Sequence, residues 1–183
     1  MDKVEKMELV SVDSQRIKTV IDIYFHWKQL DAEIRTLSGT RGINFPSEIS
    51  EYLTCYALGL KVNKEGSNGD AVDMTDPKHP KIVEIKGSSA EESSAPSSFS
   101  PTEHFDELVF ARLNKKDDTL MIYRLGINSQ DLKKIKVSST QTVGDQQKQG
   151  RRPRFSIQDK IVDKNNLKPD VIFYIREKKI DKS

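Results

Sequence analysis

Residues 69–89 read GDAVDMTDPKHPKIVEIKGSS. Two short apolar runs flank a polar segment that contains two prolines, and this pattern predicts strands at residues 70–74 and 81–86 joined by a turn over residues 75–80. The two strands are expected to pair as a hairpin. Because helices are expected before this hairpin and further strands after it, the chain is expected to form a mixed α/β domain.

One face of the hairpin carries ionisable side chains. Alternation along the second strand places Glu84 and Lys86 on one face, while the apolar residues between them face the core. A pairing of Met74 with Ile82 would place Asp70 opposite Lys86 and on the same face as Glu84. Two carboxylates and one amine would then converge.

Two carboxylates beside a lysine suit the hydrolysis of a phosphodiester. That reaction needs charge to be neutralised in the transition state and a water molecule to be activated, and Mg²⁺ held by carboxylates can do both. Asp70 and Glu84 are therefore predicted metal ligands, and the backbone carbonyl of Ile85 is expected to complete the shell. Lys86 would orient the attacking water or stabilise the developing negative charge.

The acid-x-Lys pattern also occurs at residues 76–78, 131–133 and 177–179. The last follows an earlier aspartate, Asp170, but no turn separates Asp170 from Glu177. Along an extended strand the two carboxylates would stand about 23 Å apart, at about 3.3 Å per residue, so they cannot share an ion. A turn between the two acids is required, and the hairpin provides it.

The choice between two aspartates depends on the register of the hairpin. A slip of one residue would replace Asp70 by Asp73, because it exchanges the two faces of the strand. Asp70 is preferred, because Gly69 before it allows a close approach of the backbone and the metal.

Helices are expected on the N-terminal side of the hairpin. Apolar residues, Leu30 and Ile34 among them, recur at steps of three and four from Ser14 to Leu37, with Asp13 or Ser14 as the N-cap. Their broad face suits a core helix and leaves room for a subunit interface. A second helix is expected from Pro46 to Leu60, with proline in its first turn.

After the hairpin, residues 87–100 are rich in serine and are interpreted as a mobile loop. Residues 105–113 are expected to form a short helix or strand, and residues 119–125 and 171–175 to form apolar strands.

Composition limits the class of protein. Of the 183 residues, 35% are hydrophobic and 32% are charged, which suits one domain with its own core. The single cysteine excludes an intrachain disulfide, no stretch is apolar enough to span a bilayer, and the first residues do not resemble a signal peptide, so a cytoplasmic protein is expected. The net charge of +2 does not indicate a nucleic-acid partner, but basic residues gather at 148–154 and acidic residues around 70–92.

The hairpin resembles the core of the PD-(D/E)XK nuclease superfamily, and within it the small Type II restriction endonucleases. The resemblance covers about residues 46–125, with Gly69 in place of the proline of the superfamily name. It implies a restriction-endonuclease-like core, a central four- to five-stranded mixed sheet flanked by helices, and Mg²⁺ dependence. It also implies metal binding by Asp70 and Glu84 and a catalytic role for Lys86.

The superfamily often adds an acid from a helix before the hairpin. Glu48 and Glu51 both qualify. Glu48 is preferred as the further metal ligand because it flanks the apolar face of its helix, whereas Glu51 points almost opposite that face.

A polar segment after the catalytic strands is the candidate for DNA recognition. Arginine can bond guanine through two hydrogen bonds, glutamine can do the same with adenine, and basic side chains neutralise phosphates. In the superfamily such basic loops often enter the major groove. The expected DNA-binding residues are Gln147, Lys148, Gln149, Arg151, Arg152 and Arg154, with Arg41 and Ser88 as weaker candidates.

A single nuclease domain is thus expected over residues 1–183. It would contain an N-terminal helical part at 1–45 that serves as a scaffold or dimer interface, a catalytic core at 46–125, and a DNA-recognition loop at 138–160. The leading interpretation is a Type II restriction endonuclease that cuts double-stranded DNA at a short, G·C-containing palindrome and leaves 5′-phosphate ends. A homodimer and a cognate DNA methyltransferase in the same restriction-modification system would accompany it.

Three alternatives stay open. One is a structure-specific repair or junction-resolving nuclease, and another is a methylation-dependent nuclease. The third is a non-catalytic DNA-binding protein with a nuclease-like fold. The sequence also does not distinguish DNA from RNA as the substrate.

Overall fold

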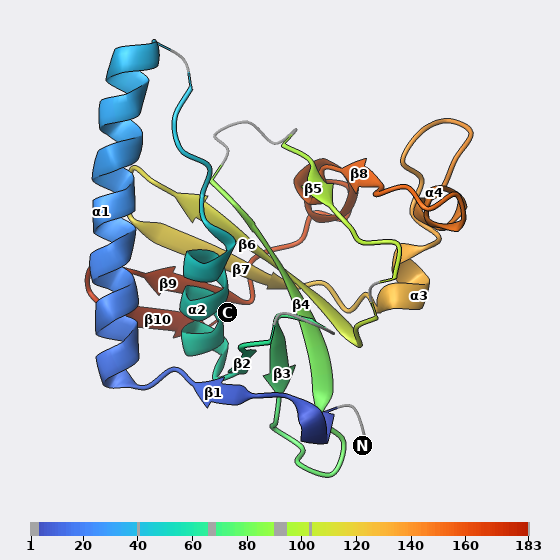
Figure 1. Cartoon of the computed structure of the whole chain (residues 1–183), viewed down its shortest axis with the longest axis horizontal. Helices are drawn as coiled ribbons and strands as arrows, with labels where there is room; N and C mark the ends of the chain where they lie inside the picture. The colour runs from blue at the N-terminus through green and yellow to red at the C-terminus, as the bar shows by residue number, and fades with distance from the viewer. Residues whose placement is uncertain (1–3, 40, 66–68, 90–94, 103, 183) are drawn as a thin grey trace.

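The computed structural model describes residues 4–39, 41–65, 69–89, 95–102 and 104–182. Eight strands form the main sheet: β1 (Leu9–Ser11), β2 (Lys61–Asn63), β3 (Ala71–Asp73), β4 (Lys81–Ser88), β6 (Glu107–Asn114), β7 (Thr119–Arg124), β9 (Val171–Tyr174) and β10 (Lys179–Lys182). Their order is β1-β2-β3-β4-β6-β7-β9-β10, and β4 with β6 is the parallel pair in an otherwise antiparallel sheet (Figure 1). A second, two-stranded sheet pairs β5 (Ser97–Ser98) with β8 (Arg154–Phe155).

The mixed α/β class is confirmed, but the expected sheet of four to five strands was too small. The three strands β1, β2 and β10 were missed because each has only one or two apolar residues, too few for an apolar run like that of β9. Residues 107–114 form a strand rather than a helix. Within the expected loop at 87–100, β4 continues to Ser88 and β5 forms further on, while residues 90–94 lie outside the described residues.

Helices cover both faces of the main sheet. The first face packs under α1 (Ser14–Ser38) and α2 (Ser47–Leu58), and the second under β5, β8, α3 (Ser129–Leu132), α4 (Val143–Lys148) and a π-helix (Gln158–Asp163) (Figure 1). A short 3₁₀ helix, Val4–Lys6, begins the described chain. Val83 and Ile85 belong to the first cluster and Ile82 to the second, as alternation along a strand requires.

The long helix α1 begins and ends where its local chemistry dictates. Asp13 is the N-cap, because its carboxylate accepts the backbone N–H of Arg16 at 2.7 Å. Gly39 ends the helix in the left-handed conformation, with φ of 77°. Among the described residues, no helix is long and apolar enough to cross a membrane.

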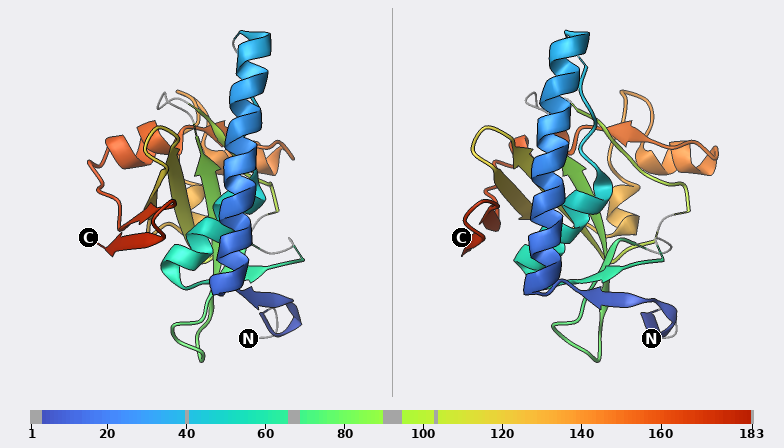
Figure 2. Two further views of the ribbon diagram at one scale, coloured as in Figure 1. Left: turned by 90° about the vertical axis from the view of Figure 1, so that its left-hand side faces the viewer. Right: turned by 60° about the vertical axis from the view of Figure 1, so that its left-hand side comes forward.

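The C-terminal turns of α1 extend beyond the sheet (Figure 2). The expectation that Leu30 and Ile34 continue the core-facing stripe was therefore wrong, since they are 51% and 41% exposed. Leu37 is 84% exposed, and Ile23 is 50% exposed. The periodicity of a sequence indicates a helix face but does not show where the neighbouring layer ends.

The hairpin of β3 and β4 forms, but its expected register was wrong. Val72 pairs with Ile82, two residues away from the expected pairing of Met74 with Ile82. The turn begins earlier because the carboxylate of Asp73 accepts the backbone N–H of Thr75, which removes Met74 from the strand. Since a shift of two residues preserves the faces, the ionisable residues still share one side of the hairpin.

Candidate active site

Glu84 and Lys86 project from β4 on the face that looks toward the small second sheet. The side chain of Glu84 is 4% exposed and that of Lys86 is 20% exposed, and the two form an ion pair. The ammonium of Lys86 also lies 5.3 Å from the ring centroid of buried Phe99. Their positions two residues apart on one strand bring the acid and the amine together.

Asp70 lies where β3 begins, next to the same strand. Its backbone N–H donates to the carbonyl of Val83 at 3.0 Å, and its carboxylate accepts the N–H of Ile85 at 2.7 Å. Gly69 has φ of +86°, and a Cβ at this position would lie 2.5 Å from Cγ2 of Ile82. Glycine therefore allows the chain to approach β4 closely enough for Asp70 to reach it.

The helix-borne acid in the cleft is Glu51. Its side chain is partly buried and lines the same cleft as Asp70, Glu84 and Lys86. Burial, with the negative charges of Asp70 and Glu48, raises the pKa of Glu51 to about 8.

The preference for Glu48 is not supported, because Glu48 is exposed and lies outside the lining of the cleft. Its carboxylate accepts a hydrogen bond from Ser47 at 3.2 Å. The sequence was misleading because α2 is buried over a wide arc, with Ser50, Thr54 and Cys55 buried besides its apolar stripe. A single apolar face therefore could not indicate which acid points into the cleft.

Asp73, the alternative to Asp70, belongs to a separate cluster. Its carboxylate pairs with Arg124 at 2.7 Å, and Arg124 also pairs with Glu107 at 2.6 Å. Burial alone would raise the pKa of Asp73, but hydrogen bonds from Thr75 and Arg124 lower it to about 2. The structure therefore places Asp73 in a salt-bridge network outside the cleft.

The cleft has a volume of about 1220 Å³ and runs from the acids to the loop after α1. Its lining includes Ile85 and two of the weaker DNA-contact candidates, Arg41 and Ser88. It also includes Arg35 and Lys115, which the sequence did not single out. Nothing in the local sequence distinguishes these two residues from ordinary charged surface residues, because folding is what brings them to the cleft.

The acids around the cleft have the oxygen-donor chemistry that suits Mg²⁺. In the part of the chain that the structure describes, no group of three or more His, Cys, Asp or Glu side chains is close enough to hold a metal ion. Glu84 is paired with Lys86, and the carboxylate of Asp70 accepts a backbone N–H. The oxygen donors of Asp70 and Glu84 fit a hard cation, which one or two carboxylates and water can hold.

The segment expected to read DNA is folded rather than an open loop. Residues 138–160 contain α4, β8 and the start of the π-helix. Gln147 uses its amide to donate to the backbone carbonyl of Ser100 at 2.9 Å, which makes it a structural residue in this conformation. The other candidates in this segment are exposed: Lys148, Gln149, Arg151, Arg152 and Arg154.

Comparison with known proteins gives the family. The family model described as "Bsp6I restriction endonuclease" matches residues 12–164. The chain belongs to the Bsp6I restriction endonuclease family. It is 48% identical over 175 residues to "Type II restriction enzyme Bsp6I" of Bacillus sp. (strain RFL6), covering 96% of this chain and 97% of that protein.

Family membership confirms the interpretation of the sequence as a Type II restriction endonuclease. The matched region contains α1, the hairpin, the acids of the cleft and the segment from α4 to β8. No solved structure matches the chain.

Proposed function

We propose that this restriction endonuclease hydrolyses DNA in the cleft between α2 and the β3–β4 hairpin, with Asp70, Glu84 and Lys86 as catalytic residues. The observation that carries the proposal is that two acids and a lysine from this hairpin line one cleft, together with a third acid, Glu51. Family membership supports DNA as the substrate. The resemblance of the hairpin to the PD-(D/E)XK superfamily supports the assignment of roles.

Asp70, Glu84 and Glu51 would hold the divalent cation. The backbone carbonyl of Ile85 is a fourth candidate. The N–H of Ile85 points toward Asp70, and the N–H and C=O of a residue in a strand point to the same side, so this carbonyl also points toward Asp70. When bound, Mg²⁺ supplies a water of lowered pKa and neutralises charge on the phosphate. Glu51, whose pKa is raised to about 8, would lose its proton on becoming a ligand.

Lys86 is positioned to act on the reacting phosphate. Its ammonium is held by Glu84 and by the face of Phe99, so only a small set of orientations is open to it. From this position it would orient the attacking water or stabilise the negative charge that develops on the phosphate oxygens. Hydrolysis would leave a 5′-phosphate and a 3′-hydroxyl, as the superfamily resemblance implies.

DNA recognition is assigned to the segment from α4 to β8. The exposed side chains of Lys148, Gln149, Arg151, Arg152 and Arg154 provide donors for base edges and phosphates. Phe155 of this segment stacks on Phe99 at 5.1 Å, and Phe99 contacts Lys86. Phe99 therefore connects the proposed recognition segment to Lys86.

A homodimer would place two such sites on a palindrome. The exposed apolar residues of α1, namely Ile23, Leu30, Ile34 and Leu37, support a contact between two copies of this helix. Two-fold symmetry in the protein would then match two-fold symmetry in a short G·C-containing site. A cognate methyltransferase would protect the same site in the host.

The test is cleavage of unmethylated phage DNA by the purified protein, with Mg²⁺ and with EDTA. Discrete fragments that need Mg²⁺, with 5′-phosphate ends at one palindrome, are expected. A smear, or cutting confined to branched or methylated DNA, would favour the alternative nucleases. The absence of any turnover, with binding retained, would favour the non-catalytic protein.

A further inference from the structure

The cleft has two chemically different ends. The acids Glu51, Asp70 and Glu84 line it together with Lys86, and the bases Arg35, Arg41 and Lys115 line it as well. Lys115 follows Phe110, the β6 partner of Lys86, by five residues, so the two lysines lie in different parts of the cleft. The bases come from the last turn of α1, from the loop after it, and from the turn that joins β6 to β7. A substrate that occupies the whole cleft therefore meets both signs of charge.

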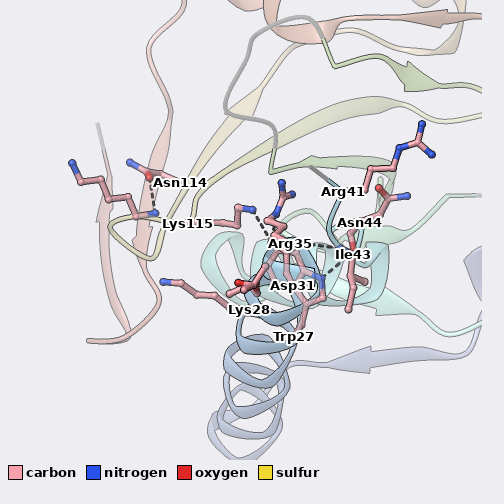
Figure 3. Close-up of polar contacts among 12 residues, drawn as sticks. Trp27, Lys28, Asp31, Arg35, Arg41, Ile43, Asn44, Asn114 and Lys115 are labelled. Carbon is pink, nitrogen blue, oxygen red and sulfur yellow. Dashed lines mark hydrogen bonds and ion pairs between the residues drawn. The ribbon is translucent and has the colours of Figure 1, made fainter. Parts of the chain in front are cut away.

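One buried carboxylate organises the basic end. Asp31 is 2% exposed, and its Oδ2 accepts from Nε of Arg35 at 3.0 Å and from Nζ of Lys115 at 2.8 Å (Figure 3). Its Oδ1 accepts the backbone N–H of Ile43 at 2.8 Å. Burial alone would raise the pKa of Asp31, but these hydrogen bonds outweigh it and lower the pKa. One negative charge thus holds two positive charges, and the cluster has a net positive charge.

The loop after α1 is fitted to this carboxylate. A Cβ at Gly42 would lie 1.9 Å from Oδ1 of Asp31, so only glycine lets the loop pass over it. Trp27 fixes the same loop by donating its indole N–H to the carbonyl of Asn44 at 3.0 Å. These contacts hold the chain next to Arg41 (Figure 3). Arg41 is one of the residues that line the cleft.

Lys115 is held from a second side. Its ammonium lies 6.0 Å from the ring centroid of Trp27, and its side chain is only 17% exposed.

The side chain of Arg35 is 48% exposed. Asp31 binds Arg35 through Nε, and an arginine has four further N–H donors on its two Nη atoms. Prearranged cations of this kind suit a phosphate group, which accepts several charge-assisted hydrogen bonds.

We propose that Arg35 and Lys115, aligned by Asp31 and assisted by Arg41, form a binding site for a backbone phosphate of the DNA strand being cut, away from the scissile phosphate. The proposal rests on DNA cleavage in this cleft. The site would fix the strand along the cleft and so place the scissile phosphate at Lys86. It carries no sequence information itself.

The chain contains a matched control. Asp118 is a second buried aspartate, 5% exposed, and it pairs with Lys28 at 2.5 Å and with Arg176 at 2.8 Å. Lys28 also comes from α1, but neither Lys28 nor Arg176 lines the cleft. In both clusters the substitution removes one lysine or arginine from a buried aspartate, but only Arg35 and Lys115 line the cleft.

The experiment compares Arg35→Gln and Lys115→Gln with Arg176→Gln and Lys28→Gln. Binding of a duplex cut by the parent is measured in EDTA at several salt concentrations. Arg35→Gln and Lys115→Gln should each weaken binding about ten-fold or more at low salt and reduce the slope of log K against log[salt] by about one. The two control variants, Arg176→Gln and Lys28→Gln, should keep the parental slope. Lys115→Arg, which keeps the positive charge, should bind DNA like the parent.

Thermal melting of all variants shows whether they fold. The phosphate site would be overturned if folded Arg35→Gln and Lys115→Gln kept the parental slope of log K against log[salt]. It would also be overturned if the control variants lost as much DNA affinity as these two. Neither result would affect cleavage by the parent. A parent that neither binds nor cuts DNA would overturn the proposed function as well.

Discussion

The carboxylate of Asp70 accepts the backbone N–H of Ile85 at 2.7 Å, which joins the acid that precedes β3 to the strand that carries the other catalytic candidates. The pairing of β3 with β4 begins at Ala71, opposite Val83. Beyond this point, the side chain of Asp70 accepts the N–H of Ile85 in place of a backbone carbonyl. The same hydrogen bond holds an acid in the lining of the cleft. A structural contact and a proposed metal ligand are thus combined in one residue.

Asp70→Asn should separate these two roles. The amide oxygen can still accept the N–H of Ile85, so the melting temperature should change little. The loss of a charged ligand should lower the rate of DNA cleavage by at least about 100-fold. Cleavage assays in Mg²⁺ check this. A variant that cuts DNA at the parental rate would show that Asp70 is not a ligand.

Asp73→Asn should have the opposite effect, on stability rather than on cleavage. Hydrogen bonds from Thr75 and Arg124 lower the pKa of Asp73 to about 2. These contacts therefore stabilise the fold above about pH 4, and their contribution is lost as the pH falls toward 2. The variant should lose roughly 2 kcal/mol at pH 7 and show less acid sensitivity than the parent. Urea unfolding at pH 7 and pH 3 measures both, and equal losses at the two values would contradict the prediction.

Glu51 should make the metal-free protein less stable as the pH rises. Its pKa is about 8, above the ordinary value of 4.5, so between these values the folded protein holds a proton that the unfolded chain has lost. In EDTA, the melting temperature of Glu51→Gln should fall less between pH 5 and pH 8.5 than that of the parent. Glu33→Gln, at an exposed position on α1, is the control and should follow the parent.

The recognition segment should contain two kinds of residue: exposed side chains that bind DNA, and one glutamine that stabilises the fold. Arg152→Gln should weaken DNA binding without changing the melting temperature, because its side chain is exposed. Gln147→Ala removes the hydrogen bond to Ser100 and should cost about 1 kcal/mol of stability. Thermal melting and binding titrations measure the two effects. If Arg152→Gln lowered stability and Gln147→Ala did not, the division would be wrong.

The exposed stripe on α1 should control assembly. Ile34→Asp and Leu37→Asp place charges on residues that are 41% and 84% exposed, so the fold should tolerate them while a dimer through α1 should dissociate. Sedimentation velocity compares the variants with Leu167→Asp, a control at a residue that is 38% exposed and lies outside α1. A parent that sediments as a monomer, or variants that remain dimers, would contradict this interface.

Long, regular patterns made much of the fold predictable. The helix expected from Ser14 to Leu37 is α1 within one residue, and the hairpin forms where two prolines and two apolar runs indicated it. The short strands β1, β2 and β10 are determined by their neighbours in the sheet rather than by their own sequence, so they could not be predicted.

The candidate site was predictable where it depends on one strand. Alternation along β4 is a local rule, and it places Glu84 beside Lys86 whatever the register of the hairpin. The choice of Glu51 over Glu48 depends on how deeply α2 is buried, which its sequence does not show. The approach of Lys115 to Asp31 joins residues 84 positions apart, and no local pattern indicates it.

The most direct test of the proposed centre is a comparison of Lys86→Ala with Lys81→Ala, an exposed lysine on the same strand and outside the cleft. Both variants are assayed for cleavage in Mg²⁺ and for DNA binding in EDTA. Lys86→Ala should lose at least about 100-fold in cleavage rate while it binds the same DNA, and Lys81→Ala should cut like the parent. Parental cleavage by Lys86→Ala would contradict the assignment of the catalytic site to this hairpin.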